Sequence, residues 1–387
     1  MNEPITPAEA DQLIQLAPKA TESVILEAAI GRMLATSIMA DRALPPYSRA
    51  MMDGIAFNSD TLDPASFEIA GLHPAGSPPP EAIPEGQAWE IMTGAIVPED
   101  CDTVVPYEHL SEEKNRIVED YRPGQYIHPE GTDADDCATL VSARTRVGAP
   151  EIAIAASVGQ TKLNVTCLPR FGILSTGDEV VHPDIKPKPW QIRRSNGPAL
   201  AAIIRSLNLP LDFHQHGPDD EGQLATLLDR ALESTDILII SGGISRGKKD
   251  YIRPLLEARL GAPAFHGVKQ RPGRPLAFWA GPPAVFALPG NPVSALATFA
   301  RYVRPAIERF QGIPEFRRRF LPPKDLKPLD GFTWLAPIQL SSAGLKLRAP
   351  RNSGDYVSIT AATGVLEVPP ASEFVQDKPL NYYPFSD

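Results

Sequence analysis

Between residues 168 and 312, apolar runs alternate regularly with amphipathic segments, and this alternation constrains the fold more than any other feature of the sequence. Phe171–Leu174 and Ile237–Ile240 are short apolar runs typical of buried strands, whereas Pro198–Leu207 carries apolar residues at helical spacing. Further strands are predicted at Leu211–His216, Leu276–Trp279 and Ala284–Leu288, and further helices at Asp219–Glu233, at Tyr251–Leu260 and from Pro292 onward, with Asn291 as the cap. We therefore expect a doubly wound, mainly parallel α/β domain over residues 168–312, which binds ligands at the carboxyl ends of its strands.

The sequence outside this range predicts three further parts. Residues 46–133 are rich in proline and glycine between short apolar runs, which indicates an inserted β-rich lobe. Residues 1–45, together with 134–167, are expected to form an extended N-terminal domain. It should begin with a helix from a capping box at Thr6 through Leu16, with a second helix over residues 24–39. Residues 313–387 are predicted to form a small C-terminal β domain, with Arg317–Arg319 on a solvated linker.

Charge and cysteine content exclude several classes of function. The formal net charge is −10, so the chain as a whole should not attract nucleic acid, and any anionic ligand must be held by local basic clusters. No apolar run approaches the ~18 residues of a membrane span, and no signal peptide is apparent. The three cysteines form no C-x-x-C pair, which favours a reducing cytoplasm and gives no reason to expect a cysteine-based metal site.

Three loops that follow predicted strands contain unusual residues. They are Ser175–Glu179, the segment that starts at Ser241, and Pro289–Ser294. Because parallel strands end at one edge of the sheet, we expect these loops to lie together. Glycines let the backbone approach a ligand, and the first amides of a helix favour an anion. Each loop alone is also explained as an ordinary turn or helix start, so the prediction depends on their common edge.

The segment SGGISRGKKDY, residues 241–251, resembles a phosphate-binding P-loop but departs from it at one position. The P-loop reads G-x-x-x-x-G-K-[ST], and its hydroxyl group binds magnesium. Here Lys249 takes that position, and its ammonium group would repel the metal ion. We interpret the segment as a glycine turn at an anion crevice, with Asp250 available as a metal ligand.

Basic and acidic side chains occur beside the same loops. The turn Arg271–Arg274 holds two guanidinium groups close together, an arrangement that suits an oxyanion, although two solvated surface arginines are the alternative. Carboxylates near an anion site often bind a divalent cation such as Mg²⁺, although Asp219 or Asp220 could simply cap a helix. The other basic residues are Arg193, Arg194, Arg246, Lys248 and Lys249, and the other acidic residues are Asp178, Glu179 and Asp250.

With these residues assembled, the sequence resembles the molybdopterin molybdenumtransferases, the family of MoeA and the gephyrin E-domain. The resemblance covers nearly the whole chain, in order. It rests on Ser48–Ala56, Met92–Ala95, Val104–Glu108, Arg122–Asp133, Ser175–Glu179, Ser241–Tyr251, Arg271–Pro275 and Leu288–Ala295, the last of which reads L-P-G-N-P-V-S-A as in the family. Eight segments in register make the assignment much stronger than any single one.

The resemblance implies a reaction, a multi-domain fold and a set of site residues. Family members hydrolyse adenylated molybdopterin with a divalent cation, release AMP and place molybdate on the dithiolene sulfurs. The implied catalytic residues are Asp53, Asp133, Glu179, Asp219 and Asp250, of which Glu179, Asp219 and Asp250 would bind Mg²⁺. Molybdate would be held by Arg271, Arg274, Ser245 and Ser294. Molybdopterin would be bound by Thr176, Gly177, Asp178, Asn196, Ser241, Gly242, Gly243, Pro289, Gly290, Asn291 and Pro292.

The resemblance also implies a homodimer and leaves alternatives open. In the family dimer the N-terminal lobe faces the α/β domain of the other subunit, so Asp53 and Asp133 would complete the partner's site. A molybdopterin adenylyltransferase is the expected upstream partner. Alternatives are a carrier that binds the cofactor without turnover, or an enzyme for another nucleotide or pterin, or for tungstate. The departures that raise these alternatives are Arg271 and Arg274 in place of lysines, Tyr126, His128, Arg194, Arg246, Lys248, Lys249 and Thr363.

Overall fold

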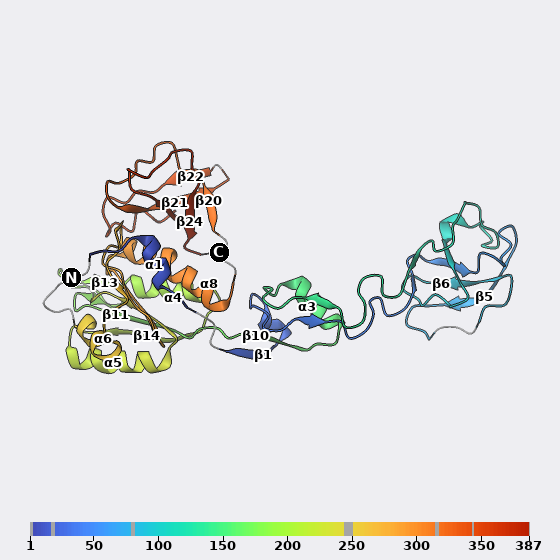
Figure 1. Ribbon diagram of the computed structural model, residues 1–387, viewed down its shortest axis with the longest axis horizontal. Helices are drawn as coiled ribbons and strands as arrows, with labels where there is room; N and C mark the ends of the chain where they lie inside the picture. The colour runs from blue at the N-terminus through green and yellow to red at the C-terminus, as the bar shows by residue number, and fades with distance from the viewer. Residues whose placement is uncertain are drawn as a thin grey trace. The chain divides into compact units, whose positions relative to one another are not determined.

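The computed structural model describes residues 3–16, 20–78, 82–243, 251–313, 317–342 and 344–386. The chain divides into two compact units, shown in Figure 1. Unit 1 comprises Met1–Glu22 and Thr166–Asp387, and unit 2 comprises Ser23–Val165. The finer division into four parts stays a prediction. No helix in the described ranges is long and apolar enough to cross a membrane.

Unit 1 is built on a six-stranded sheet of order β14-β11-β15-β19-β18-β16. The first four strands, which make up most of the sheet, are parallel; β18 pairs antiparallel with β19, and β16 pairs antiparallel with β18. The multi-domain α/β class with a doubly wound, mainly parallel sheet is therefore confirmed. The strands are β14 (Leu211–Gly217), β11 (Phe171–Thr176), β15 (Ile237–Ser241), β19 (Ala284–Leu288), β18 (Ala277–Trp279) and β16 (Phe265–His266).

Helices cover both faces of this sheet, as the alternating sequence pattern predicts (Figure 1). One face packs against α1 (Pro7–Leu13), α4 (Asn196–Ser206) and the continuous helix formed by α7 (Pro292–Thr298), the π-helix η2 (Phe299–Val303) and α8 (Arg304–Gln311). The other face packs against α5 (Glu221–Ser234) and α6 (Ile252–Leu260). Each face buries aliphatic and aromatic side chains, and this burial provides most of the driving force for folding.

The start of α1 follows the sequence prediction closely. The Thr6 hydroxyl accepts a hydrogen bond from the Glu9 amide at 3.2 Å, and the Glu9 carboxylate accepts one from the Thr6 amide at 2.7 Å. This reciprocal capping box satisfies two amides that the first helical turn leaves without partners. The helix ends at Leu13, three residues earlier than the Leu16 predicted.

The C-terminal part of unit 1 is a second six-stranded sheet. It contains β17 (Gln270–Arg271), β21 (Thr333–Ser341), β23 (Gly364–Val368), β24 (Leu380–Pro384) and β20 (Arg318–Phe320), with β22 (Gly344–Leu347) beside β21. Arg318 and Arg319 are exposed, as expected of a solvated face, but they lie on the edge strand β20 rather than in a linker. A two-stranded parallel pair, β12 (Val180–Val181) and β13 (Ile192–Arg193), completes the described strands of unit 1.

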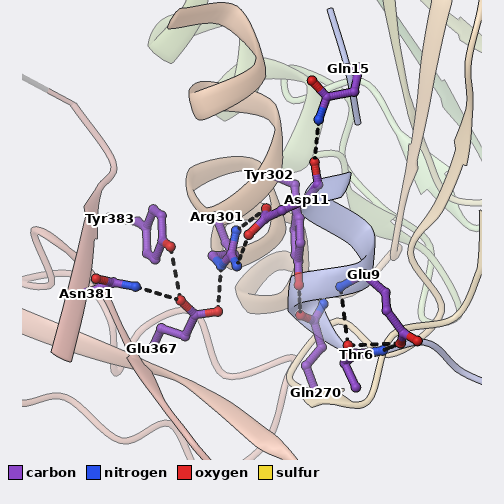
Figure 2. Close-up of polar contacts among 10 residues, drawn as sticks. All are labelled: Thr6, Glu9, Asp11, Gln15, Gln270, Arg301, Tyr302, Glu367, Asn381 and Tyr383. Atoms are coloured by element: carbon purple, nitrogen blue, oxygen red, sulfur yellow. Dashed lines mark hydrogen bonds and ion pairs between the residues drawn. The ribbon is translucent and has the colours of Figure 1, made fainter. Parts of the chain in front are cut away.

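A buried arginine joins the two sheets of unit 1 (Figure 2). Arg301, on the π-helix, is 2% exposed. Its guanidinium donates two hydrogen bonds of 2.8 Å to the Asp11 carboxylate on α1 and one of 2.7 Å to Glu367 on β23. The Tyr383 hydroxyl also donates to Glu367, at 3.0 Å. These charge-assisted contacts fix the C-terminal sheet against the α/β core.

Unit 2 is β-rich, in agreement with its turn-rich sequence. Its largest sheet has the order β5-β6-β4-β7 and its core is apolar. The elements are β2 (Ile38–Met39), β3 (Arg49–Ala50), β4 (Gly54–Phe57), β5 (Glu68–His73), β6 (Gln87–Ile91), β7 (Thr103–Pro106), η1 (Tyr107–His109), β8 (Ile127–His128), β9 (Thr139–Val141) and α3 (Ala149–Ser157). At its end, β1 (Thr21–Ile25) pairs with β10 (Lys162–Thr166).

The predicted helix over residues 24–39 is wrong. Only α2 (Leu26–Ala29) is helical there, between β1 and a stretch of bridge pairs. The backbone leaves the helix at Ile30, whose ψ is 128°, and Gly31 then adopts a φ of +78°, so the helix does not resume. Met33 and Leu34 then pair with Arg146 and Val165 as isolated bridges. Long-range strand pairing therefore overrides a local apolar pattern of mixed periodicity.

Candidate active site at the carboxyl ends of the parallel strands

A cavity of about 1000 Å³ lies where the parallel strands of unit 1 end. Strands β11, β15 and β19 run in the same direction, so the loops that follow them meet at one edge. All three loops singled out in the sequence contribute to the wall. The predicted residues found there are Thr176, Gly177, Glu179, Asn196, Asp219, Ser241, Gly242, Gly243, Pro289, Gly290, Asn291 and Pro292.

Two glycines let these loops approach each other closely. Gly242 and Gly243 have φ angles of +96° and +69°, which side-chain-bearing residues rarely adopt. A Cβ on Gly242 would lie 3.0 Å from the carbonyl oxygen of Thr176, and one on Gly243 would lie 2.7 Å from Cγ1 of Ile252. The glycine pair is therefore required by the local backbone, and it leaves main-chain groups at the cavity wall.

Asn196 ties the end of α4 to two of the strand-end loops. Its Nδ2 donates hydrogen bonds to Ser241 Oγ at 2.9 Å and to the carbonyl oxygen of Gly290 at 2.7 Å. One side-chain amide thus bridges the loops after β15 and β19. This cross-link holds the cavity wall in place without a ligand.

Two predicted carboxylates, Glu179 and Asp219, line the cavity. The amide of Asp219 donates to Asp178 Oδ1 at 3.0 Å, and the amide of Asp178 donates to Asp219 Oδ2 at 3.4 Å. These reciprocal contacts hold the loop after β11 against the start of α5. Asp220, not Asp219, caps α5, because its side chain accepts from the Gln223 amide at 2.8 Å. Asp219 is therefore not required as the helix cap.

The cavity wall also contains two basic residues, Arg193 and Arg194, and the charge of Arg194 acts on two half-buried histidines. Arg194 lines the cavity, and among the described residues its buried Nε has no hydrogen-bond acceptor. Burial and the positive charge of Arg194 lower the pKa of His214 and of His216. Ser175 Oγ lies 3.1 Å from His216 Nδ1 at the end of β11. With these histidines neutral, the positive charge at this point of the wall comes from Arg193 and Arg194.

The predicted arginine pair lies on the turn after β17 but does not line this cavity. Both guanidiniums lie over the ring of Phe332, Arg271 at 4.7 Å and Arg274 at 5.9 Å from its centroid. Both residues are exposed. The two arginines thus contact the same ring, whereas Pro275 is the residue of this turn that reaches the cavity wall.

The remaining predicted residues are distributed over both units. Ser294 is buried on α7. Asp53 and Asp133 are exposed in unit 2, where Asp53 Oδ1 accepts hydrogen bonds of 2.6 Å from both the amide and the hydroxyl of Thr93. Ser245 and Asp250, and with them Arg246, Lys248 and Lys249, lie outside the described residues. Asp178 lies beside the cavity through its contacts with Asp219.

Asp133 is held by a histidine whose protonation the geometry defines. His128 Nδ1 lies 3.3 Å from Arg49 Nη2, and its Nε2 lies 3.0 Å from Asp133 Oδ1. Because a guanidinium can only donate, Nδ1 accepts and Nε2 carries the proton that is donated to Asp133. Within the described ranges, however, no three Asp, Glu, His or Cys side chains form a group that could hold a metal ion by themselves.

Sequence reasoning missed the contribution of the C-terminal sheet. Gly354 and Tyr356, from the loop between β22 and β23, line the cavity. Pro187 and Gln191, from the loop between β12 and β13, also line it, as does Ile192 at the start of β13. The C-terminal residues follow no strand of the parallel sheet, so the rule that places ligands at strand ends gave no signal for them.

The fold and the cavity define a doubly wound α/β protein with a candidate ligand site, to which residues beside the C-terminal sheet also contribute. Two family models match the chain: the MoeA N-terminal region (domain I and II) over residues 5–159, and the probable molybdopterin binding domain over residues 172–309. The chain belongs to the molybdopterin molybdenumtransferase family, because it is 33% identical to the molybdopterin molybdenumtransferase of a Synechocystis strain over 89% of this chain and 90% of that protein.

Further relatives agree with this assignment. The molybdopterin molybdenumtransferase of a Nostoc strain is 37% identical and covers 79% of this chain and 74% of its own length. A solved structure of a molybdopterin biosynthesis MoeA protein from Pyrococcus horikoshii covers 100% of both chains at 27% identity, with a TM-score of 0.84. The family resemblance recognised from the sequence motifs is therefore confirmed.

Proposed function

We propose that this protein is an active molybdopterin molybdenumtransferase. It would bind adenylated molybdopterin, hydrolyse the adenylate to release AMP, and insert molybdenum from molybdate in molybdenum cofactor biosynthesis. The observation that carries the proposal is the cavity in which three glycine-containing loops lie beside Glu179 and Asp219. A phosphate-bearing ligand needs backbone donors and a partly desolvated cationic group, and these loops and Arg194 can supply both.

The binding loops would hold the substrate mainly through the backbone. Gly177, Gly242 and Gly290 bring main-chain groups to the cavity wall, and Asn196 keeps two of these loops together. Among the described residues Arg194 Nε has no hydrogen-bond acceptor, and the guanidinium is a donor that suits a phosphate oxygen. Fixing the phosphate in a preformed cavity lowers the entropic cost of reaching the reactive geometry.

Glu179 and Asp219, together with Asp250, are the residues that would hold Mg²⁺. Magnesium is commonly bound by one or two carboxylates plus substrate phosphates and water, so two carboxylates on one cavity wall fit this ion. When bound, Mg²⁺ would neutralise charge that develops on the departing AMP. Asp219 is available for this role because Asp220 caps α5 in its place.

Arg271 and Arg274, with Ser245 and Ser294, are proposed to hold molybdate. Both guanidiniums contact the ring of Phe332, which gives each a cation–π partner in spite of their like charge. An oxyanion between or beside them would relieve that repulsion. The proposal therefore assigns charge neutralisation and orientation of molybdate to this turn, and phosphate binding to the cavity.

Asp53 and Asp133 are proposed to act from the partner subunit of a homodimer. Both are exposed on unit 2 and restrained by neighbouring donors, Thr93 and His128, as expected of groups that complete a site on another surface. A cytoplasmic location and delivery of substrate by a molybdopterin adenylyltransferase complete the proposal.

The test mixes the full-length protein with adenylated molybdopterin, molybdate and Mg²⁺ and measures AMP release. Asp219→Asn and Asp250→Asn should each lower AMP release about 100-fold or more, because each removes charge that stabilises the transition state. Asp229→Asn, a change on the distant part of α5, is the control. Tight substrate binding without AMP release would instead support a carrier, and release of a different nucleotide product would support a related enzyme. Substituting tungstate for molybdate measures the choice of oxyanion.

A further inference from the structure

Tyr356 is the only aromatic side chain in the cavity wall among the described residues. It belongs to the loop between β22 and β23 of the C-terminal sheet, and it is 53% exposed. The other described wall residues are small, polar, charged, aliphatic or proline. The cavity therefore has a polar region at the strand ends and one aromatic surface contributed by a different sheet.

The loop that carries Tyr356 is held by its own hydrogen bonds. The Asp355 carboxylate accepts from the Arg351 amide at 3.1 Å and from the Ser358 hydroxyl at 2.6 Å. The Asn352 side chain accepts from the Gly354 amide at 2.9 Å. These bonds fix the backbone on both sides of Tyr356, so little conformational entropy would be lost when a ligand contacts it.

The same loop is also tied to the cavity itself. Asn291 Nδ2 donates to Ser353 Oγ at 2.7 Å, and the Val293 amide donates to the Ser353 carbonyl oxygen at 3.2 Å. Both donors lie at the start of α7, beside the glycine loop after β19. Ser353, three residues before Tyr356, thus connects this loop to the polar wall. These contacts restrain the position of Tyr356.

We propose that Tyr356 is a stacking platform for a flat nitrogen heterocycle of the substrate, and so determines specificity for ligands that carry such a ring. The inference rests on the proposed function, because adenylated molybdopterin carries two such rings, adenine and pterin. The strand-end loops would bind the phosphate, and Tyr356 would contact a ring of the same ligand. Stacking needs only a π-face, so it adds affinity without any hydrogen-bonding group.

The experiment compares two probes by calorimetry on the full-length protein. AMP carries phosphate, ribose and a ring, whereas ribose 5-phosphate lacks the ring. Tyr356→Leu should weaken AMP binding about 5- to 100-fold, the range for loss of one base–aromatic stack, and leave ribose 5-phosphate binding unchanged. Tyr356→Phe should retain AMP binding. Trp190→Leu is the control, because Trp190 is a 71% exposed aromatic residue outside the cavity wall.

Turnover separates the outcomes. Tyr356→Leu should raise KM for adenylated molybdopterin with little change in kcat, because stacking contributes equally to ground state and transition state. A raised KM with unchanged AMP binding would assign the platform to the pterin ring. Unchanged AMP binding and unchanged KM would overturn the inference. A wild-type protein that neither binds AMP nor releases it would refute the proposed function, whatever Tyr356 does.

Discussion

The two compact units hold their functional carboxylates in different ways. In unit 1, Glu179 and Asp219 lie in the wall of a cavity formed by loops at the end of one sheet. In unit 2, Asp53 and Asp133 lie on an exposed surface, each restrained by one neighbouring donor residue. The difference agrees with the proposal that the carboxylates of unit 1 act within one chain, whereas those of unit 2 act on the partner subunit.

The largest expected effect tests whether the two units are energetically separate. Arg301→Met leaves Asp11 and Glu367 without their cation, with side chains only 20% and 14% exposed, so the free energy of unfolding of unit 1 should fall by about 3–5 kcal/mol. Urea unfolding measures the loss of free energy of unfolding, and hydrogen exchange shows which unit loses amide protection. Arg259→Met, which breaks the more exposed pair with Asp229, should cost at most about 1 kcal/mol. If amide protection from hydrogen exchange fell equally in unit 2, the two units would not be energetically separate.

The next effect tests whether unit 2 completes a site on another chain. Asp53→Asn and Asp219→Asn should each reduce AMP release about 100-fold as separate proteins. Subunits mixed at random should recover about a quarter of wild-type activity, because about half of the dimers are mixed and each has one intact site. Asp120→Asn, an exposed change in unit 2, is the control. Activity that stays low after verified subunit exchange would place both residues in the site of the same protomer.

A smaller effect concerns the charge of Asp53. Hydrogen bonds from the Thr93 hydroxyl and amide hold the pKa of Asp53 below its usual value. Its contribution to stability is therefore present above the unfolded pKa and lost as pH falls through the folded pKa. Thr93→Val should raise the Asp53 pKa, so that this loss starts at a higher pH. NMR titration of the Asp53 carboxyl group measures the shift, with Thr132→Val as the control; an unmoved titration would exclude Thr93 as its cause.

The smallest expected effect concerns the rate at which Cys101 is alkylated, which should not change when unit 1 is destabilised. Burial, with help from Asp100 and Asp102, raises the pKa of the Cys101 thiol in unit 2 to about 12. Iodoacetamide at pH 8 should therefore modify the exposed Cys137 first and reach Cys101 only when unit 2 opens. The Cys101 rate should be the same in wild type and Arg301→Met. Mass spectrometry of the labelled peptides checks this, and faster Cys101 labelling in the variant would show coupling between the units.

The sequence predicted the cavity loops because their positions depend on topology alone. Ser175–Glu179, Ser241–Gly243 and Pro289–Pro292 each follow a parallel strand, and parallel strands must end at one edge. The placement of Arg271 and Arg274 on one tight turn was also predictable, because proline and glycine stand between them. Their common contact with Phe332 was not, because it depends on how the second sheet packs.

Other features depend on contacts between distant segments. Tyr356 reaches the cavity through Ser353, which contacts Asn291 and Val293, and nothing near Tyr356 in the sequence indicates that pairing. The error at residues 24–39 has the same origin, since bridge pairs with Arg146 and Val165 decide the local structure. Local patterns therefore identify strands and turns, while packing between sheets decides which residues complete the site.

The π-helical turn at Phe299–Val303 allows one continuous helix to contact the cavity at its start and the C-terminal sheet further along. A π-helical turn accommodates one residue more than an α-helical turn, so the side chains beyond it are rotated by roughly 100° about the axis. Before the turn, Pro292 lies in the cavity wall; within it, Arg301 points to α1 and β23. Deleting a single residue here would keep the helix but turn α8 away from the core, so length at this point is as constrained as composition.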